Sequence, residues 1–237
     1  MRNRTLKKSI ISMLAAGDLA GILALQDKYP RHHLINFLIG FLCHTDEMVK
    51  WRAVTALGQL VAALADEDME AARIVMRRFM WMLNDESGGI GWGVPEAMAE
   101  VMACHAGLAG EYAHMTVANM REEGNFLELP MLQRGLIWGI GRLAGARPEL
   151  MREKKAGLYL TQYLDSADPE VRGRAVWAFG RLDEPPPEKI SQLQDDPAKV
   201  TIYRHPELKT CTVGELAHKV LHSGATASSL PSPRSVL

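Results

Sequence analysis

Residues 168–180 read DPEVRGRAVWAFG and residues 46–58 read DEMVKWRAVTALG, so two distant segments of the chain carry one pattern. Four copies of this pattern end at Gly58, Ala99, Gly141 and Gly180, which lie 41, 42 and 39 residues apart. A repeat of about 40 residues that carries an apolar helical stripe is typical of stacked helix pairs, because each pair buries its apolar face only against its neighbours. The sequence therefore predicts an α-solenoid.

Each copy places apolar residues at the spacing of one helix face. These residues are Val49, Ala53, Ala56 and Leu57, then Ile90, Val94, Ala97 and Met98, then Leu132, Leu136, Gly139 and Ile140, then Val171, Ala175, Ala178 and Phe179. Weaker amphipathic stretches precede them at about 31–43, 68–83, 109–122 and 149–164. We expect each stretch to form the first helix of a pair and each copy of the pattern to form the second.

Capping residues mark where the second helices begin. Asp46, Asp85 and Asp168 stand just before them, where a short carboxylate accepts the unpaired N–H groups of the first turn. Pro169 follows Asp168 directly, and a proline fits the first helical turn because no helical partner exists there for its missing N–H. The pattern predicts an all-α fold, an armadillo-like α-α superhelix.

The segment 168–180 resembles a HEAT repeat, in particular the HEAT-like repeats first described in phycobilisome lyases, and the segment 46–58 is similar. The resemblance extends over about 30–185 and implies a fold that serves many functions. The stretch 91–98, GWGVPEAM, departs from an ordinary repeat and resembles an uncharacterised group of bacterial HEAT-repeat proteins. That group implies no particular reaction.

Residues 1–29 are predicted to form an N-terminal helical pair ahead of the repeats at 30–185. Basic residues before the apolar run 10–16 are similar to a short signal peptide, which is the alternative. The run is brief, however, and Asp18 follows at once as a helix cap. We therefore expect a cytoplasmic protein, and no apolar run is long enough to span a bilayer.

The pattern of the repeats breaks at three consecutive prolines, 185–187. Alternating residues at 199–203 and 208–212 then predict a β-hairpin, and a helix is expected at 213–221. Because a lone hairpin is marginally stable, we expect residues 186–222 to pack on the last repeat as a cap. Residues 223–237 are small, polar and proline-bearing, and are predicted to be disordered.

Composition narrows the class of partner. The chain has 237 residues, of which 47% are hydrophobic and 23% charged, so it can bury a substantial core. Its formal net charge of -1 gives no general attraction to nucleic acid or to an acidic membrane, and neither is expected as a partner. The cysteines, Cys43, Cys104 and Cys211, lack the spacing of a metal or redox site and fit a reducing compartment.

Equivalent positions of the second helices should form columns across a concave groove. Candidate groove residues are Arg52, Trp92, Gly93, Glu96, Glu100, Gly135, Trp138, Arg142, Arg174, Trp177 and Arg181. In one interpretation the glycines leave room, the tryptophans stack on a ligand, and Arg142 and Arg181 hold its anionic group. In the alternative, Glu100 and Arg142 form a salt bridge between repeats and both Trp138 and Trp177 belong to the core.

Two further site types have weaker support. The glycines at 88–93 could cradle a phosphate at a helix start, but no nucleotide-loop lysine follows, and a tight turn before Pro95 explains them equally well. Glu96 and Glu100 share a helix face, as metal-binding carboxylates do. Deoxyhypusine hydroxylases, which have this fold, carry His-Glu pairs for two irons, whereas here Pro95 stands in place of the histidine. We expect no metal, no cofactor and no catalytic residue.

The sequence therefore favours a non-enzymatic scaffold that binds a protein or peptide in its groove, such as an assembly or maturation factor. One alternative is a bilin-lyase-like protein that binds a tetrapyrrole or a similar planar acid. A second alternative is a DNA glycosylase of the HEAT-like alkylpurine type, because Trp138, Trp177 and Arg181 are reminiscent of that family. The groove columns hold no aspartate for its chemistry, and the balanced charge argues against it.

Overall fold

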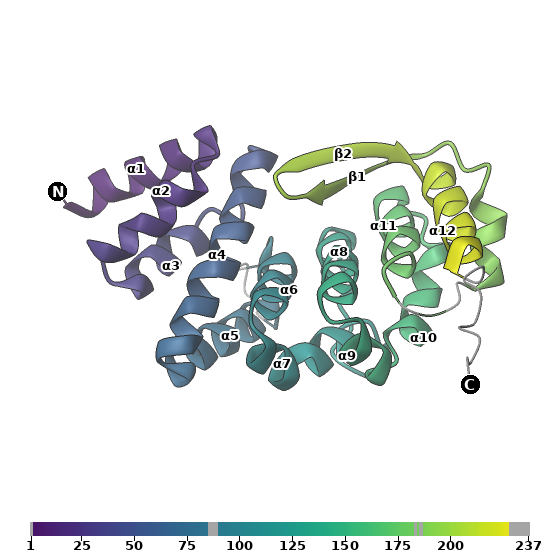
Figure 1. The fold of residues 1–237 in the computed structure, drawn as a ribbon, viewed down its shortest axis with the longest axis horizontal. Coiled ribbons are helices and arrows are strands. Elements are labelled where there is room, and N and C mark those ends of the chain that lie inside the picture. Colours follow the sequence, from purple (N-terminus) through teal and green to yellow (C-terminus); the bar gives the residue numbers. More distant parts are fainter. Residues whose placement is uncertain (1, 85–89, 183, 185–186, 228–237) are drawn as a thin grey trace, which may run out of the picture.

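Paired helices stack side by side along the computed structural model, which describes residues 2–84, 90–182, 184 and 187–227. The second helices form one row, in the order α4 (Glu47–Glu67), α6 (Val94–Cys104), α8 (Pro130–Ala146) and α11 (Pro169–Phe179). The first helices form an outer layer (Figure 1). They are α3 (Arg31–Ile39), α5 (Met69–Leu83), α7 (Ala106–Ala118), α9 (Pro148–Glu153) and α10 (Ala156–Leu160), with the 3-10 turn η2 (Thr161–Asp165) after α10.

The predicted caps are confirmed where the structure describes them. The Asp46 carboxylate accepts hydrogen bonds from the backbone N–H groups of Met48 and Val49, at 2.8 and 3.2 Å. The Asp168 carboxylate accepts one from Glu170 N at 2.9 Å. These bonds satisfy N–H groups that have no partner within the helix. The third predicted cap, Asp85, lies outside the described residues.

The core is the apolar stripe of the second helices. Leu57 is fully buried and Phe179 is 4% exposed, as the repeat pattern predicts. Helices α6 and α8 approach closely at Gly139, where a Cβ atom would lie 2.8 Å from the Cβ of Ala99. A larger residue at 139 would push the two helices apart, so this glycine sets their spacing.

The N-terminal helices α1 (Arg2–Ala16) and α2 (Leu19–Ala24) pack on α4, and the 3-10 turn η1 (Leu25–Asp27) leads on to α3. Asp18 caps α2, as predicted, by accepting from Gly21 N at 2.8 Å. Arg52 of α4 donates to the carbonyl oxygens of Leu14 and Ala15, which stand at the end of α1. Within the described part of the chain, each helix is too short or too polar to cross a lipid bilayer.

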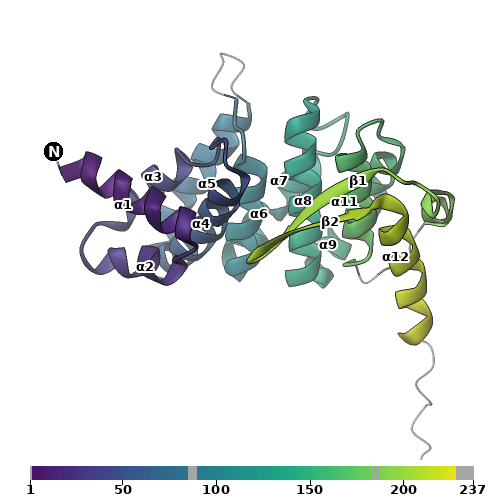
Figure 2. The ribbon, with the colours of Figure 1, turned by 90° about the horizontal axis from the view of Figure 1, so that it is seen from above.

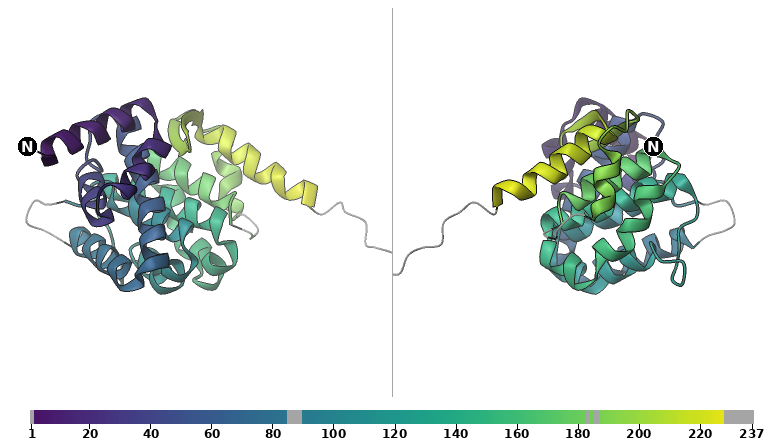
Figure 3. Two further views of the ribbon diagram at one scale, coloured as in Figure 1. Left: turned by 60° about the vertical axis from the view of Figure 1, so that its left-hand side comes forward. Right: turned by 90° about the vertical axis from the view of Figure 1, so that its right-hand side faces the viewer.

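The C-terminal part consists of the 3-10 turn η3 (Glu188–Leu193), strands β1 (Lys199–Arg204) and β2 (Glu207–Thr212), and helix α12 (Val213–Ala227). The hairpin and the helix are confirmed. Helix α12 packs on α11 and leads away from the stack (Figure 3). The expectation of disorder from residue 223 is wrong for residues 223–227, which continue α12. Residues 223–227 are Ser, Gly, Ala, Thr and Ala, and weak helix formers can extend a helix that is already formed, because its nucleation cost has been met.

The hairpin does not stay on the last repeat, and in this respect the expected position of the cap is wrong. It runs from α11 across the row of second helices to α4 (Figures 1 and 2). Strand β1 buries Val200, Ile202 and Tyr203, which are at most 3% exposed. These side chains pack on different helices, because Val200 lies against Gly173 of α11 and the ring of Tyr203 stacks on Trp51 of α4. We call the surface of α4, α6, α8 and α11 under the hairpin the inner face.

Candidate binding site on the inner face

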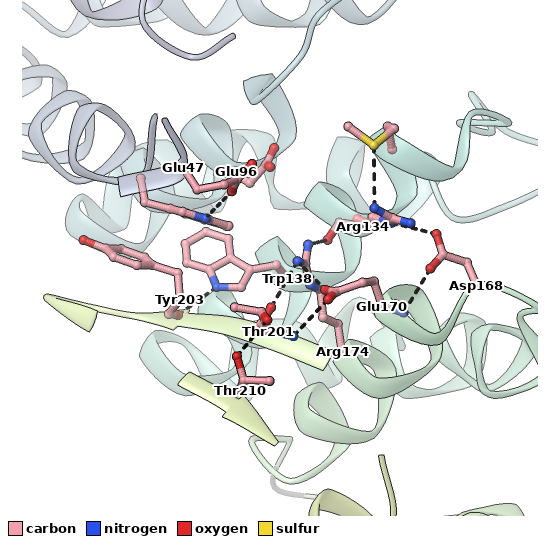
Figure 4. A network of polar contacts seen from close by, with 12 residues as sticks. Glu47, Glu96, Arg134, Trp138, Asp168, Glu170, Arg174, Thr201, Tyr203 and Thr210 are labelled. Atoms are coloured by element: carbon pink, nitrogen blue, oxygen red, sulfur yellow. Dashed lines mark hydrogen bonds and ion pairs between the residues drawn. The ribbon is translucent and has the colours of Figure 1, made fainter. Parts of the chain in front are cut away.

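Side chains of α8 and α11 form hydrogen bonds with the backbone of β1 along the edge of the strand that faces the helices (Figure 4). Trp138 Nε1 donates to the carbonyl oxygen of Tyr203 at 3.0 Å, and Arg174 donates to that of Thr201 at 3.1 Å. The Thr201 N–H donates to Glu170 Oε1 at 3.0 Å. The hairpin therefore contacts the helices through this edge of β1, and β2 is the strand farther from the helices (Figure 1).

An aromatic cluster fixes the far end of β1. The rings of Trp51 and Tyr203 stack with centroids 4.9 Å apart, and the ring of Trp138 lies 4.6 Å from that of Trp51. The Tyr203 hydroxyl lies 3.0 Å from both Thr55 Oγ1 and His205 Nδ1. Trp138 is only 2% exposed, so its ring is part of the core and offers no free face to a ligand.

A cavity of about 280 Å³ lies beside the hairpin, next to the first turns of the second helices. Its lining residues are Glu47, Lys50, Trp51, Glu96, Met131, Arg134, Glu170, Arg174, Thr201 and Leu208. We call this side of the hairpin the carboxylate flank.

Each cation of the carboxylate flank has a carboxylate partner. Lys50 Nζ lies 3.1 Å from Glu96, Arg134 lies 2.7 Å from Asp168, and Arg174 lies 2.7 Å from Glu170. Glu47 is a further carboxylate of the lining, and it accepts from Trp51 Nε1 at 3.1 Å. The lining therefore holds three carboxylates, those of Glu47, Glu96 and Glu170, and three cations, and Asp168 outside the lining pairs with Arg134.

Two glycines of the predicted site have structural roles here. A Cβ atom on Gly135 would lie 2.2 Å from Glu96 Oε2, so the carboxylate of Glu96 already fills the space that we expected for a ligand. Gly93 has a φ of +74° at the start of α6, and a Cβ atom there would lie 2.6 Å from the Leu42 carbonyl oxygen. Only glycine adopts this conformation without strain.

Three arginines gather on the opposite side of the hairpin, and we call Arg142, Arg181 and Arg204 the arginine cluster. The guanidinium carbons of Arg181 and Arg204 lie 5.3 and 5.9 Å from the ring centroid of Trp177. Arg142 pairs with Glu100 through two hydrogen bonds, at 2.6 and 3.1 Å. Partial burial and the nearby charges of Arg204 and Arg142 lower the pKa of Arg181.

The predicted site residues fall into separate groups. The expected pairing of Glu100 with Arg142 between repeats is present, and Trp177 is buried beneath two arginines. Arg52 holds the end of α1, and Trp92 is exposed in the turn before α6 and does not line the cavity.

Sequence reasoning missed the residues that the hairpin brings to this face. Tyr203 and Arg204 lie on β1 and outside every repeat column, so no alignment of repeats could have placed them there. Trp51 stands one position before Arg52 in the sequence and outside the columns, so the column pattern does not point to it.

Within the described part of the inner face, neither a reactive thiol nor a set of metal ligands is present. Desolvation and the Glu100 carboxylate raise the pKa of the Cys104 thiol to about 11, which keeps it protonated at neutral pH. Among the residues that the structure describes, no three histidine, cysteine or acidic side chains gather as metal ligands would.

A family model for the HEAT-like repeat matches residues 130–182, which contain α8 and α11. An uncharacterised protein of Archaeoglobus fulgidus is 39% identical over 64 residues, 27% of this chain. The match spans only 32% of that relative's length.

Two solved structures resemble the fold across nearly the whole chain. The designed armadillo repeat protein YIII(Dq)4CqI has a TM-score of 0.56 and 17% identity, with 93% of each chain covered. A second designed armadillo repeat protein, in complex with the peptide (KR)4, has the same score and identity and covers 93% of this chain and 92% of its own. At such identities the likeness concerns the fold alone. The chain therefore folds as a helical repeat solenoid similar to armadillo repeats, with a HEAT-like repeat at 130–182 and a C-terminal hairpin and helix.

Proposed function

We propose that this solenoid is a non-enzymatic scaffold that binds a protein or peptide partner on its inner face, as an assembly or maturation factor would. One observation carries the proposal: the inner face already holds an extended chain. Trp138, Arg174 and Glu170 contact backbone atoms of β1, so their contacts do not depend on which side chains the strand carries. Because β1 itself occupies these groups, they support the proposal as an example of an extended chain on this face, and a partner would use the surface beside it.

The resemblance in fold supports the same reading. A designed armadillo repeat protein has been solved in complex with the peptide (KR)4. In the present chain β1 and β2 occupy the inner face, so a partner would meet the hairpin and its two flanks. We propose that it binds beside the hairpin, because β1 is too deeply buried to leave readily.

The alternatives lose support on this geometry. A planar tetrapyrrole would need a free aromatic face, but Trp138 is buried under the hairpin, and Trp177 is 6% exposed beneath two arginines. A DNA substrate would place phosphates beside the hairpin, but the three cations that line the carboxylate flank are already paired with carboxylates. These observations favour a protein partner.

Capture from a native lysate by the immobilised full chain tests the proposal. The variants Arg142→Ala, Arg181→Ala and Glu96→Gln alter the inner face, and Arg77→Ala on the outer helix α5 is the control. We expect the inner-face variants to recover less of the partner that the wild type recovers, at equal folded concentration, and the control to match the wild type. Equal recovery by all four variants would mean that the partner binds outside the inner face.

A further inference from the structure

We propose that a second cavity, between the N-terminal helices, α4 and the turn of the hairpin, binds a short aliphatic carboxylic acid. The carboxylate would pair with Arg52, and the aliphatic part would lie on the apolar floor of the cavity. The cavity has a volume of about 180 Å³ and shares no lining residue with the one on the carboxylate flank. A small-molecule site here goes beyond the proposed function and does not depend on it.

Three segments that are far apart in the sequence form this cavity. They are the corner between α1 and α2, the first half of α4, and the turn of the hairpin at 205–206 (Figure 1). Existing contacts hold them together: the Tyr203 hydroxyl lies 3.0 Å from both Thr55 Oγ1 and His205 Nδ1, and Arg52 donates to two carbonyl oxygens at the end of α1. A cavity that is already formed loses less entropy when a ligand binds.

The floor of the cavity is apolar. Leu14 and Ile22 are at most 1% exposed, and Met13 and Leu19 are partly buried against the core. An aliphatic chain on this floor would leave water, which strengthens binding by about fourfold for each methylene group. An apolar cavity of about 150 Å³ holds a benzene molecule, so the present volume suits a ligand of about six to eight heavy atoms.

Arg52 brings an incompletely paired cation to this cavity. Its Nη1 donates to the Leu14 and Ala15 carbonyl oxygens at 2.8 and 2.7 Å. Within the described part of the chain, its Nε and Nη2 form no hydrogen bond and no carboxylate pairs with it. Asp18, which is close in the sequence to the end of α1, uses its carboxylate to cap α2. Neutral carbonyl oxygens therefore meet the charge of Arg52 on one side only.

Gly17 keeps the backbone close to this guanidinium group. Its φ is +77°, and a Cβ atom there would lie 3.2 Å from Arg52 Cζ. A side chain at this position would be strained and would crowd the guanidinium group. Ala16, Gly17 and His205 are the exposed members of the lining, so the cavity opens to solvent beside them.

The polar groups of the lining fit a carboxylate. The Nε and Nη2 atoms of a guanidinium group offer two parallel N–H donors, which match the two oxygens of a carboxylate. His205 uses Nδ1 for its contact with the Tyr203 hydroxyl, so Nε2 is the ring nitrogen left for a ligand. A phosphate carries nearly two negative charges, whereas Arg52 is the one lysine or arginine of the lining. The cavity therefore suits a monocarboxylate with a short aliphatic chain.

Calorimetric titration of the full chain with 4-methylpentanoate, which has eight heavy atoms, tests the inference. We expect it to bind at least about tenfold more tightly than 4-methylpentanamide, which lacks the charge, and than acetate, which lacks the aliphatic chain. It should also raise the melting temperature, because it binds only the folded chain. Equal binding of the amide would overturn the role of Arg52, and equal binding of acetate would overturn the role of the floor.

Three further results would contradict the choice of ligand. Tighter binding of inorganic phosphate would overturn the choice of a carboxylate. Tighter binding of the tripeptide Gly-Gly-Leu, whose last residue carries the same carboxylate and a similar branched chain, would overturn the choice of a free acid. Absence of saturable heat up to about 10 mM 4-methylpentanoate would refute the site itself.

Two variants separate the contribution of the charge from that of the cavity. Arg52→Gln should weaken the acid by at least about tenfold and leave the amide unchanged. Leu19→Trp fills the cavity and keeps Arg52, so it should abolish the binding of both ligands. The matched control Arg77→Gln on α5 should bind like the wild type. Arg52 also holds the end of α1, so thermal melting must show that each variant is folded, and undiminished binding of the acid by either folded variant would refute the assignment.

Discussion

The hydroxyl of Tyr203 should contribute measurably to the stability of the whole chain. It joins the C-terminal hairpin to Thr55 of α4, which is 148 residues away in the sequence. The change Tyr203→Phe removes this contact and the one to His205, but leaves the ring stacked on Trp51. Thr55 keeps its bond to the Trp51 carbonyl oxygen, so we expect a loss of about 0.5–1.5 kcal/mol in the free energy of unfolding.

A double-mutant cycle isolates the pairwise contact. Urea unfolding of Tyr203→Phe, of Thr55→Val and of the double variant gives three changes in the free energy of unfolding. If the two hydroxyls bond each other, the changes are not additive, and the coupling is about 0.5–1.5 kcal/mol.

The larger change Tyr203→Ala measures how much the whole side chain contributes to the free energy of unfolding. It also removes the buried ring and should cost about 3–5 kcal/mol. Additive single changes together with an unaltered stability of Tyr203→Ala would refute the placement of the hairpin on α4.

Three further outcomes are expected. Leu57→Ala should lower the free energy of unfolding by about 2–5 kcal/mol in urea titrations, because Leu57 is fully buried in the repeat core. Arg142→Ala should cost about 1–3 kcal/mol by the same measurement, since it leaves the Glu100 carboxylate, 7% exposed, without its partner. Burial raises the pKa of Tyr203, so the stability that its neutral hydroxyl contributes is complete below the ordinary tyrosine pKa and is lost at higher pH. The melting temperature of the wild type should therefore fall more steeply above a pH of about 10 than that of Tyr203→Phe.

The repeats could be predicted because their signals are local. The period near 40 residues, the apolar stripe and the carboxylate before each second helix all lie within short windows of sequence. Such windows suffice to predict that Leu57 and Phe179 are buried and that Asp46 and Asp168 act as helix caps. The hairpin itself was also predictable, since strands of alternating residues around a turn form their contacts with each other.

The position of the hairpin could not be predicted from such signals. Its anchors are Thr55 and Trp138, which are 148 and 65 residues distant from Tyr203 in the sequence. Apolar residues on both faces of a strand indicate that the strand is covered, but they do not indicate which helices cover it. The same limit explains why Arg204 was missed as part of the candidate site, although Arg142 and Arg181 were found from their repeat columns.

A strand held across the inner face changes how the solenoid behaves. In an open stack each repeat contacts only its neighbours, so a change at one end is diluted along the chain. Here Tyr203 of β1 forms hydrogen bonds with α4 and α8, and Arg174 of α11 donates to the same strand. The first and last repeats therefore both contact β1. This connection fixes the spacing of the second helices before any partner arrives, and a fixed surface loses less entropy when it binds.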